Sequence, residues 1–188
     1  MPKNEKNGFT AKRIAIDALF IALEFSLGML SSHLEFGGVK ISLVALPIVL
    51  CALLCGPVDA TIVAFLGELL MQMLSWGFTQ TTLLWCLPET VRAVILSTGL
   101  LWARKTLLAD QPIGRHVLYY AICIFAAVIT SVCNTTVYYI DAKMFGYYYY
   151  ALIFGVFWVR LVVGTVIGAL LGALALPIAR RLRAARLV

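Results

Sequence analysis

The sequence has 188 residues, of which 62% are hydrophobic and only 13% are charged, and its mean hydropathy is +0.96. Soluble domains carry about 25% charged residues, so this composition excludes a soluble protein and indicates an integral membrane protein. The net charge of +6 is then expected to reflect topology and contact with anionic lipid, and no nucleic-acid partner is expected.

Six apolar windows approach the length of about 20 residues that a helix needs to cross a bilayer. They cover residues 13–32, 41–56, 58–76, 82–103, 116–140 and 150–178. The connections between them are short, and no low-complexity linker separates them. We therefore predict an all-α integral membrane protein in which residues 1–188 form a single bundle of six transmembrane helices.

The distribution of basic residues predicts the orientation, because segments rich in Lys and Arg stay on the cytoplasmic side. With the N-terminus inside, the inner segments hold eleven Lys and Arg residues, whereas the outer loops hold only Lys40 and Lys143. Arg92 and Arg160 lie within the windows. Both termini are therefore expected to be cytoplasmic.

The first window has two distinct faces when residues are placed at about 100° per position. Four alanines form one narrow stripe: Ala11, Ala15, Ala18 and Ala22. Arg13, Asp17 and Glu24 lie on another face, which must point into the bundle or water, because a charge that faces lipid costs about 2.5–3.5 kcal/mol. Small residues let another helix approach closely, so the stripe could dock a partner or pack against the protein's own helices.

The fourth window contains a proline and two charges in the stretch "CLPETVRAV". Pro88 is expected to kink the helix, because it cannot donate a backbone hydrogen bond. Trp85, Glu89 and Arg92 share one helical face, which cannot meet lipid. The two charges could neutralise each other and anchor the bundle, or they could form a polar wall that is completed by a ligand.

Other windows carry polar faces that could border the same cavity. In the third window, Glu68, Gln72 and Ser75 precede Trp76, and in the sixth, Phe157 and Arg160 lie near mid-membrane. The fifth window contributes one polar face along its length: Thr130, Asn134, Tyr138 and Asp141. Tyr147 to Tyr150 are interpreted as an aromatic belt at the outer surface. Gly164, Gly168 and Gly172 are expected to serve internal helix packing.

No enzymatic or metal-binding motif is recognisable in the sequence. The five cysteines all lie in the apolar windows and are interpreted as small apolar residues, so we expect neither a metal nor a cofactor. There is no H-E-x-x-H, G-x-S-x-G or P-loop motif, so an enzyme is not expected. Any ATP-driven transport would need hydrolysis by another subunit.

Two passages resemble the substrate-binding membrane subunit, or S component, of energy-coupling-factor (ECF) vitamin transporters. They are "AKRIAIDALFIAL" and "VKISLVALPIVLCALLCGPVDATIVAFLGELL". The second matches the family's passage from Pro47 to Gly56 and Pro57, followed by a helix with an acidic residue, which here is Glu68 in place of the commoner Asp. The P-E-x-x-R of the fourth window is not assigned to one vitamin.

The resemblance implies a high-affinity vitamin-binding subunit in a bacterial or archaeal plasma membrane. It implies docking through the alanine stripe onto a transmembrane coupling subunit that carries two ATPases, and release of the vitamin by toppling of the bundle. It also implies lids at His33 to Lys40 and at Trp76 to Gln80. The binding residues implied are Trp85, Glu89, Arg92, Asn134, Tyr138, Phe157 and Arg160, with Trp76, Gln80 and Lys40 from the lids.

The chemistry of these side chains suits a vitamin with a flat ring and an anionic group. Guanidinium groups bind carboxylates or phosphates, aromatic rings stack on a flat ring, and Glu89 can accept paired N–H donors. Folate has this shape, and "VKISLVALPI" resembles the folate branch, while riboflavin, thiamine and pantothenate are further candidates. The alternatives are a self-sufficient proton-coupled permease that uses the intramembrane carboxylates, an intramembrane enzyme and a purely structural subunit.

Overall fold

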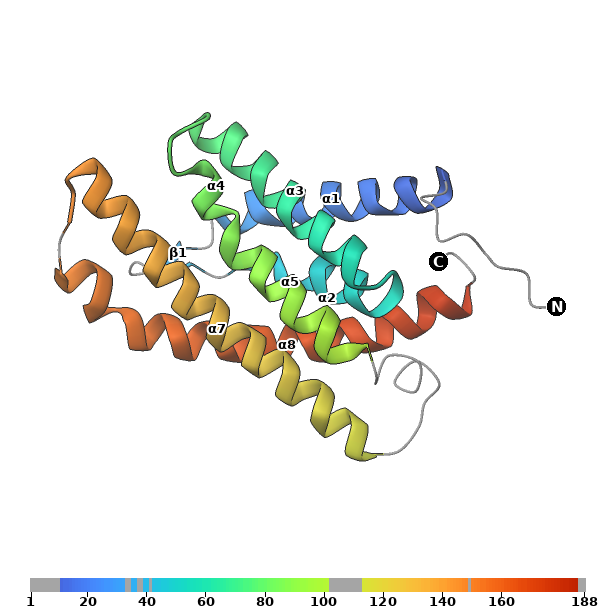
Figure 1. Cartoon of the computed structure of the whole chain (residues 1–188). Coiled ribbons are helices and arrows are strands. Elements are labelled where there is room, and N and C mark those ends of the chain that lie inside the picture. Colours follow the sequence, from blue (N-terminus) through green and yellow to red (C-terminus); the bar gives the residue numbers. More distant parts are fainter. Residues whose placement is uncertain are drawn as a thin grey trace.

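The computed structural model describes residues 11–32, 35–36, 39–40, 42–101, 113–148 and 150–185. The described elements, in chain order, are α1 (Ala11–Ser32), β1 (Glu35–Phe36), β2 (Val39–Lys40), α2 (Ala45–Leu54), α3 (Pro57–Trp76), α4 (Thr82–Trp85), α5 (Leu87–Leu100), α7 (Ile113–Phe145), the π-helix η1 (Ala151–Gly155) and α8 (Phe157–Ala184). The helices form an elongated bundle, and β1 and β2 form a short antiparallel hairpin (Figure 1). The predicted α-helical membrane class is confirmed.

Within the described residues, five helical segments are long and apolar enough to cross a membrane: α1, α3, α4 with α5, α7 and α8. Each corresponds to one predicted window. The window 41–56 instead contains α2, which has only ten residues. At 1.5 Å per residue such a helix spans about 15 Å, or half of the roughly 30 Å hydrocarbon layer. The prediction of six complete spans is therefore not confirmed.

The short helix α2 lies inside the bundle, where it packs against α1, α3, α5 and α8. Ile48, Cys51 and Leu53 are fully buried. A helix that is apolar on every side is buried in protein or in lipid, and hydropathy does not distinguish the two environments. Burial among the other helices thus explains why this window resembled a membrane span.

Glycine and proline set the corners of the chain around α2 to α5. Gly56 has φ of 125° and precedes Pro57, the first residue of α3, and Gly77 has φ of 75° directly after that helix. These left-handed conformations favour glycine. Pro88 lies in the first turn of α5, and the helical span is interrupted at Cys86. This interruption between α4 and α5 lies two residues before Pro88, where a kink was predicted.

Helices α7 and α8 pack closely through glycine. A Cβ added at Gly168 would lie 2.8 Å from the Cβ of Ala127, and one added at Gly172 would lie 3.1 Å from Cys123 Sγ. The buried Tyr119 hydroxyl also donates a 2.6 Å hydrogen bond to the Gly172 carbonyl. The prediction that these glycines serve internal packing is confirmed.

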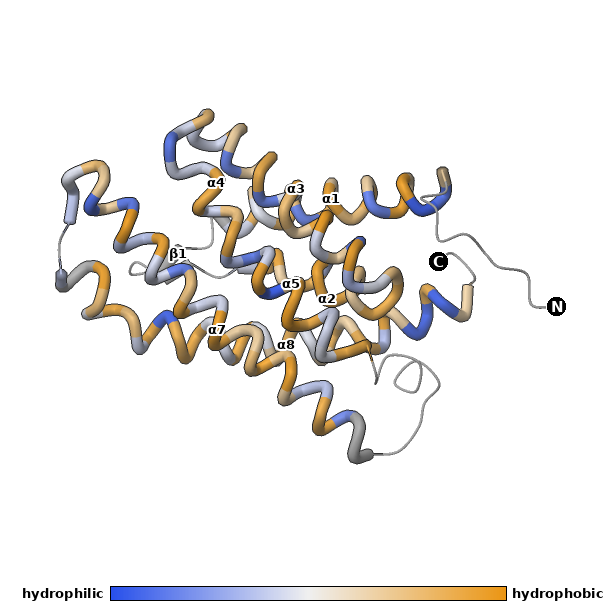
Figure 2. The backbone as a smooth tube through the Cα atoms, in the orientation of Figure 1, coloured by the Kyte–Doolittle hydropathy of each residue, from blue (hydrophilic) through white to orange (hydrophobic). Residues whose placement is uncertain are grey.

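The two ends of the bundle differ in what they contain. The start of α1, the end of α8 and the α2–α3 corner lie toward one end, which we call the terminal end (Figure 1). The hairpin, the α3–α4 connection and the α7–η1 connection lie toward the other, which we call the loop end. The helices between them are mostly hydrophobic, with hydrophilic positions inside α5, α7 and α8 (Figure 2).

Candidate functional site

A buried ion pair forms the deep part of the candidate site. Glu89 lies in the first turn of α5, and Arg92 follows three residues later on the same face. Arg92 Nη1 donates to Glu89 Oε2 at 2.6 Å, and Arg92 Nε donates to Thr130 Oγ1 of α7 at 3.3 Å. The two charges thus neutralise each other and connect α5 to α7.

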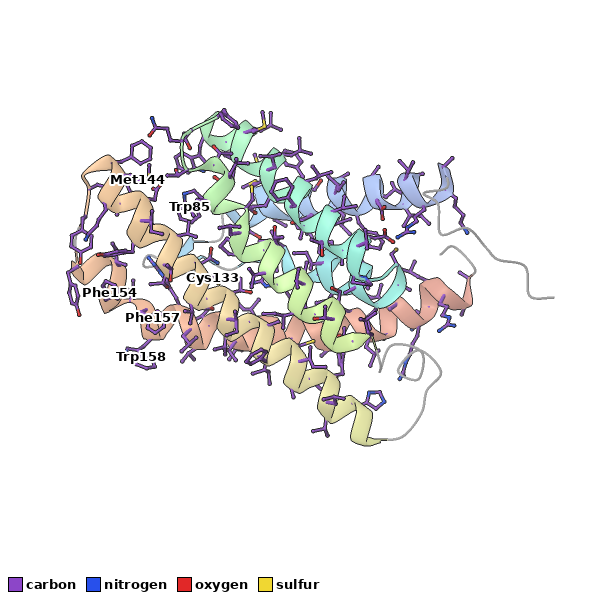
Figure 3. The ribbon with its side chains drawn as sticks, viewed as in Figure 1. Trp85, Cys133, Met144, Phe154, Phe157 and Trp158 are labelled. Atoms are coloured by element: carbon purple, nitrogen blue, oxygen red, sulfur yellow. The ribbon has the colours of Figure 1, made fainter. Side chains whose placement is uncertain are left out.

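Aromatic side chains extend the site toward the loop end. The rings of Trp85 and Tyr138 lie 6.3 Å apart between their centroids, and the Arg160 guanidinium lies 5.2 Å from the centroid of the Tyr138 ring. Trp85 is the last residue of α4, and its side chain lies in the space between α4 and α7 (Figure 3). Three helical segments that are far apart in sequence therefore converge on Tyr138, as the periodicity of their polar faces had indicated.

Tyr147 joins this cluster from the α7–η1 connection. Its ring centroid lies 6.1 Å from that of Tyr138, and its hydroxyl donates a hydrogen bond to Asp141 Oδ2. The pKa of the Tyr147 phenol is raised, mainly by partial burial and to a smaller extent by this hydrogen bond, so the hydroxyl remains a donor at neutral pH. The ring centroids of Tyr148 and Tyr139 lie 5.5 Å apart. Tyr147 and Tyr148 are therefore exposed on one side and contact α7 on the other.

Glu24 of α1 is a further member of the deep part of the site, and the sequence-based list of binding residues lacked it. Its side chain is only 1% exposed, and neither carboxylate oxygen has a hydrogen-bond partner. It interacts electrostatically with Glu89, Glu68 and Arg92. Gly67 of α3 leaves room for it, because a Cβ there would lie 2.6 Å from the Glu24 carboxylate.

The deep part of the site holds more carboxyl groups than guanidinium groups. Glu24 interacts electrostatically with Glu68, Glu89 and Arg92, and Glu89 is paired with Arg92. Glu68 also accepts a 2.7 Å hydrogen bond from the Gln72 amide. An excess of carboxylates favours a ligand group that is cationic or rich in N–H donors.

Among the described residues, Phe157 lines a pocket that none of the other predicted binding residues lines. It lines a largely apolar pocket of about 240 Å³ between α7 and the η1–α8 segment. The pocket borders a different face of α7 from the one that carries Tyr138. Phe157 and Phe154 lie near each other on the η1–α8 side of the pocket (Figure 3). The residues that line the pocket are Val132, Thr135, Thr136, Tyr139, Phe154 and Phe157. Spacing along α8 placed Phe157 near Arg160 but could not show which side of α7 it meets.

The remaining predicted binding residues lie around the cluster or at the loop end. Asn134 is half-buried on α7, between the positions of Thr130 and Tyr138. Trp76 and Gln80 are exposed at and after the end of α3, and Trp76 is 78% exposed. Lys40 pairs with Glu35 through the backbone of the hairpin, but its side chain lies outside the described residues, as does His33.

The alanine stripe of α1 is open at the surface. All four of its residues are exposed, whereas Asp17 and Glu24 on the other face are buried. The described helices therefore do not cover the stripe, and the charged face points into the bundle, as the cost of charge in lipid requires.

A comparison with protein families gives one match. The family model described as "ECF transporter, substrate-specific component" matches residues 12–180. No curated protein and no solved structure matches the chain.

Proposed function

The chain belongs to the family of ECF transporter substrate-specific components, and from this premise we propose that it is the vitamin-binding subunit of an ATP-driven importer in a bacterial or archaeal cell membrane. The observation that carries the proposal is the convergence of Trp85, Tyr138 and Arg160 beside the Glu89–Arg92 pair. This arrangement combines aromatic faces, an accepting carboxylate and a guanidinium within a multi-pass bundle. Such groups recognise small polar ring compounds.

The substrate that fits these groups has a flat, donor-rich ring and an anionic group. Trp85 and Tyr138 offer aromatic surface to the ring, and Glu89 and Glu24 can accept its N–H donors. Arg160 can bind a carboxylate or phosphate in bidentate fashion. Folate has both features, and phosphorylated thiamine shares them. Riboflavin and pantothenate match the carboxylate-rich deep part less well, because they present fewer N–H donors there.

The first test is mass spectrometry of small molecules that co-purify with the detergent-solubilised protein, followed by binding titrations with a panel of vitamins. Arg160→Ala should lose the ligand, whereas Arg183→Ala at the exposed end of α8 should keep it. Arg160 is a cleaner target than Arg92, because Arg92→Ala would leave Glu89 charged and buried, at a cost of about 3–5 kcal/mol. Folded Arg160→Ala protein that retains full affinity would contradict the proposed site.

The proposed partners are a transmembrane coupling subunit and two ATPases. The exposed alanine stripe on α1 supports docking by close helix packing, because small side chains allow backbones to approach. The family description supports a role as one component of a larger transporter. In this proposal ATP hydrolysis occurs entirely in the partner subunits.

A self-sufficient proton-coupled permease is the second candidate, and Glu24 favours it. A buried carboxylate without a hydrogen-bond partner is suited to carry a proton through a membrane protein. Proteoliposomes that contain this chain alone distinguish the two functions. Uptake driven by a pH gradient and abolished by Glu24→Gln would support the permease, whereas uptake only with partner subunits and ATP would support the importer.

A further inference from the structure

Three metal-binding side chains meet where α1 passes the end of α2. One carboxylate oxygen of Asp17 and the Sγ atoms of Cys51 and Cys55 all lie within 4.8 Å of one another. We propose that these three residues form a site for a soft divalent transition-metal ion, with Zn²⁺ as the physiological occupant. The site is separate from the Tyr138 cluster and does not depend on the proposed vitamin.

The fold places the two thiols on one side of α2. Cys51 and Cys55 are four residues apart, so their side chains lie one above the other on the helix surface. Cys51 is fully buried, and Cys55, at the end of α2, is half-buried. An ion can therefore reach the buried donors from the side of Cys55, next to the α2–α3 corner.

Asp17 supplies an independent reason for a cation at this place. It is only 5% exposed, and its Oδ1 atom is buried without a hydrogen-bond partner. Burial of a carboxylate oxygen without a hydrogen-bond partner is costly, and a coordinated cation would offset that cost. The Arg13 guanidinium nearby is bound to Asp59, with Nε at 2.9 Å from both carboxylate oxygens and Nη2 at 2.5 Å from Oδ1.

The donor set selects the kind of ion. Thiolates favour Zn²⁺ over Mg²⁺ and Ca²⁺, which prefer oxygen ligands. With Zn–S bonds of about 2.3 Å, tetrahedral coordination puts two thiolate sulfurs about 3.8 Å apart. Side-chain rotations that bring the sulfur atoms about 1 Å closer together would therefore complete the site. On binding, each thiol releases its proton to solvent, and water occupies the fourth position.

A metal here would join α1 to α2 beside the Arg13–Asp59 salt bridge, which joins α1 to α3. Both links lie toward the terminal end of the helix that carries the alanine stripe. Occupancy of the site would thus hold α1 in one position relative to the rest of the bundle.

The test is metal binding by the full chain, purified under reducing conditions with any histidine tag removed. After dialysis against Zn²⁺, elemental analysis should give one zinc per chain, and Co²⁺ should produce a thiolate-to-cobalt charge-transfer band that Zn²⁺ abolishes. Cys51→Ser and Cys55→Ser should weaken Zn²⁺ binding at least tenfold and reduce the band. Asp17→Asn should keep the band but weaken binding.

The matched control is Cys123→Ser, because Cys123 is also buried but lies on α7. It should bind Zn²⁺ and Co²⁺ as the unsubstituted chain does. If Cys51→Ser fails to fold, Cys55→Ser, at a half-buried position, and Asp17→Asn can be compared with Cys123→Ser instead. Absence of bound zinc and of the cobalt band in the folded chain would overturn the proposal, as would equal loss of binding in Cys123→Ser.

Discussion

Two tryptophans with opposite surroundings allow the candidate site to be tested at single residues. Trp85 faces Tyr138, whereas Trp158 is 70% exposed and lies on the outside of α8. Trp85→Ala should weaken vitamin binding about fivefold to 150-fold, because a stacked aromatic contributes about 1–3 kcal/mol to binding a flat ring and 1.4 kcal/mol is tenfold. Isothermal titration of the vitamin identified by mass spectrometry measures this change.

Trp158→Ala is the control for Trp85→Ala and should leave the affinity within about twofold, since a side chain exposed on the outside of the bundle does not contact the cluster. Thermal unfolding of both variants shows whether any loss of binding reflects loss of fold. Equal affinities for the two variants would place the ring of the vitamin elsewhere.

Periodicity along single helices predicted part of the candidate site but not its cross-helix contacts. It predicted that Glu89 and Arg92 share one face of a helix and that Tyr138 lies on the polar face of another, because residues three and four apart lie on the same side of a helix. It did not reveal the electrostatic interaction of Glu24 with Glu89, since the position of Glu24 depends on the space left by Gly67 of α3. Phe157 shows the same limit, because residue spacing predicts the face of a helix on which a side chain lies but not the element against which that face packs.

At the scale of elements, the packing of α7 on α8 depends on Gly168. Gly168→Ala should destabilise the protein by about 1–3 kcal/mol, because the new Cβ would meet the Ala127 Cβ at 2.8 Å and neither atom can rotate away. Reversible unfolding in mixed detergent measures the change in free energy.

Gly28→Ala is the matched control, since its Cβ would meet the flexible Met71 Sδ at 3.4 Å. It should change stability by less than about 1 kcal/mol. Ala127→Gly in the Gly168→Ala background should restore part of the loss. Unchanged stability in Gly168→Ala would show that the α7–α8 contact is looser than the structure indicates.

The alanine stripe of α1 can be tested separately from the candidate binding site. Ala18→Leu with Ala22→Leu should leave vitamin affinity unchanged and abolish assembly with the coupling subunit, because larger side chains prevent close helix approach. Co-purification with the coupling subunit and ATP-dependent uptake measure the two effects.

Ala121→Leu is the control for the stripe, because it makes the same substitution at an exposed position of α7. It should preserve both assembly and uptake. Normal uptake by the Ala18→Leu, Ala22→Leu variant would exclude the stripe as the docking surface.

The element that the sequence described least well is α2. Its apolar residues formed a window of nearly membrane-spanning length, yet the helix has ten residues and is buried within the bundle. The five long helical segments were recognisable because each contains an apolar stretch long enough to cross a bilayer. The apolar environment of α2 is the protein interior, and hydropathy does not distinguish a helix buried in protein from one buried in lipid.

At the scale of the whole molecule, the chain has an asymmetric charge distribution. Lys12, Arg13 and the exposed Arg181 and Arg183 lie toward the terminal end, whereas Lys143 lies at the loop end. Because basic segments stay in the cytoplasm, the terminal end should face inward and the candidate vitamin site should open outward. This orientation suits uptake from the surroundings of the cell.

Labelling with a membrane-impermeant maleimide tests this orientation in intact cells. Gln80→Cys, in the exposed α3–α4 connection, should be labelled without permeabilisation, and Arg183→Cys should be labelled only after it. The unsubstituted chain gives the background, since its five cysteines are buried or half-buried. The opposite pattern would place the aromatic cluster nearer the cytoplasm and would contradict a role in capturing an external vitamin. Labelling of both positions in intact cells would indicate leaky membranes, which a cytoplasmic marker protein with an exposed cysteine detects.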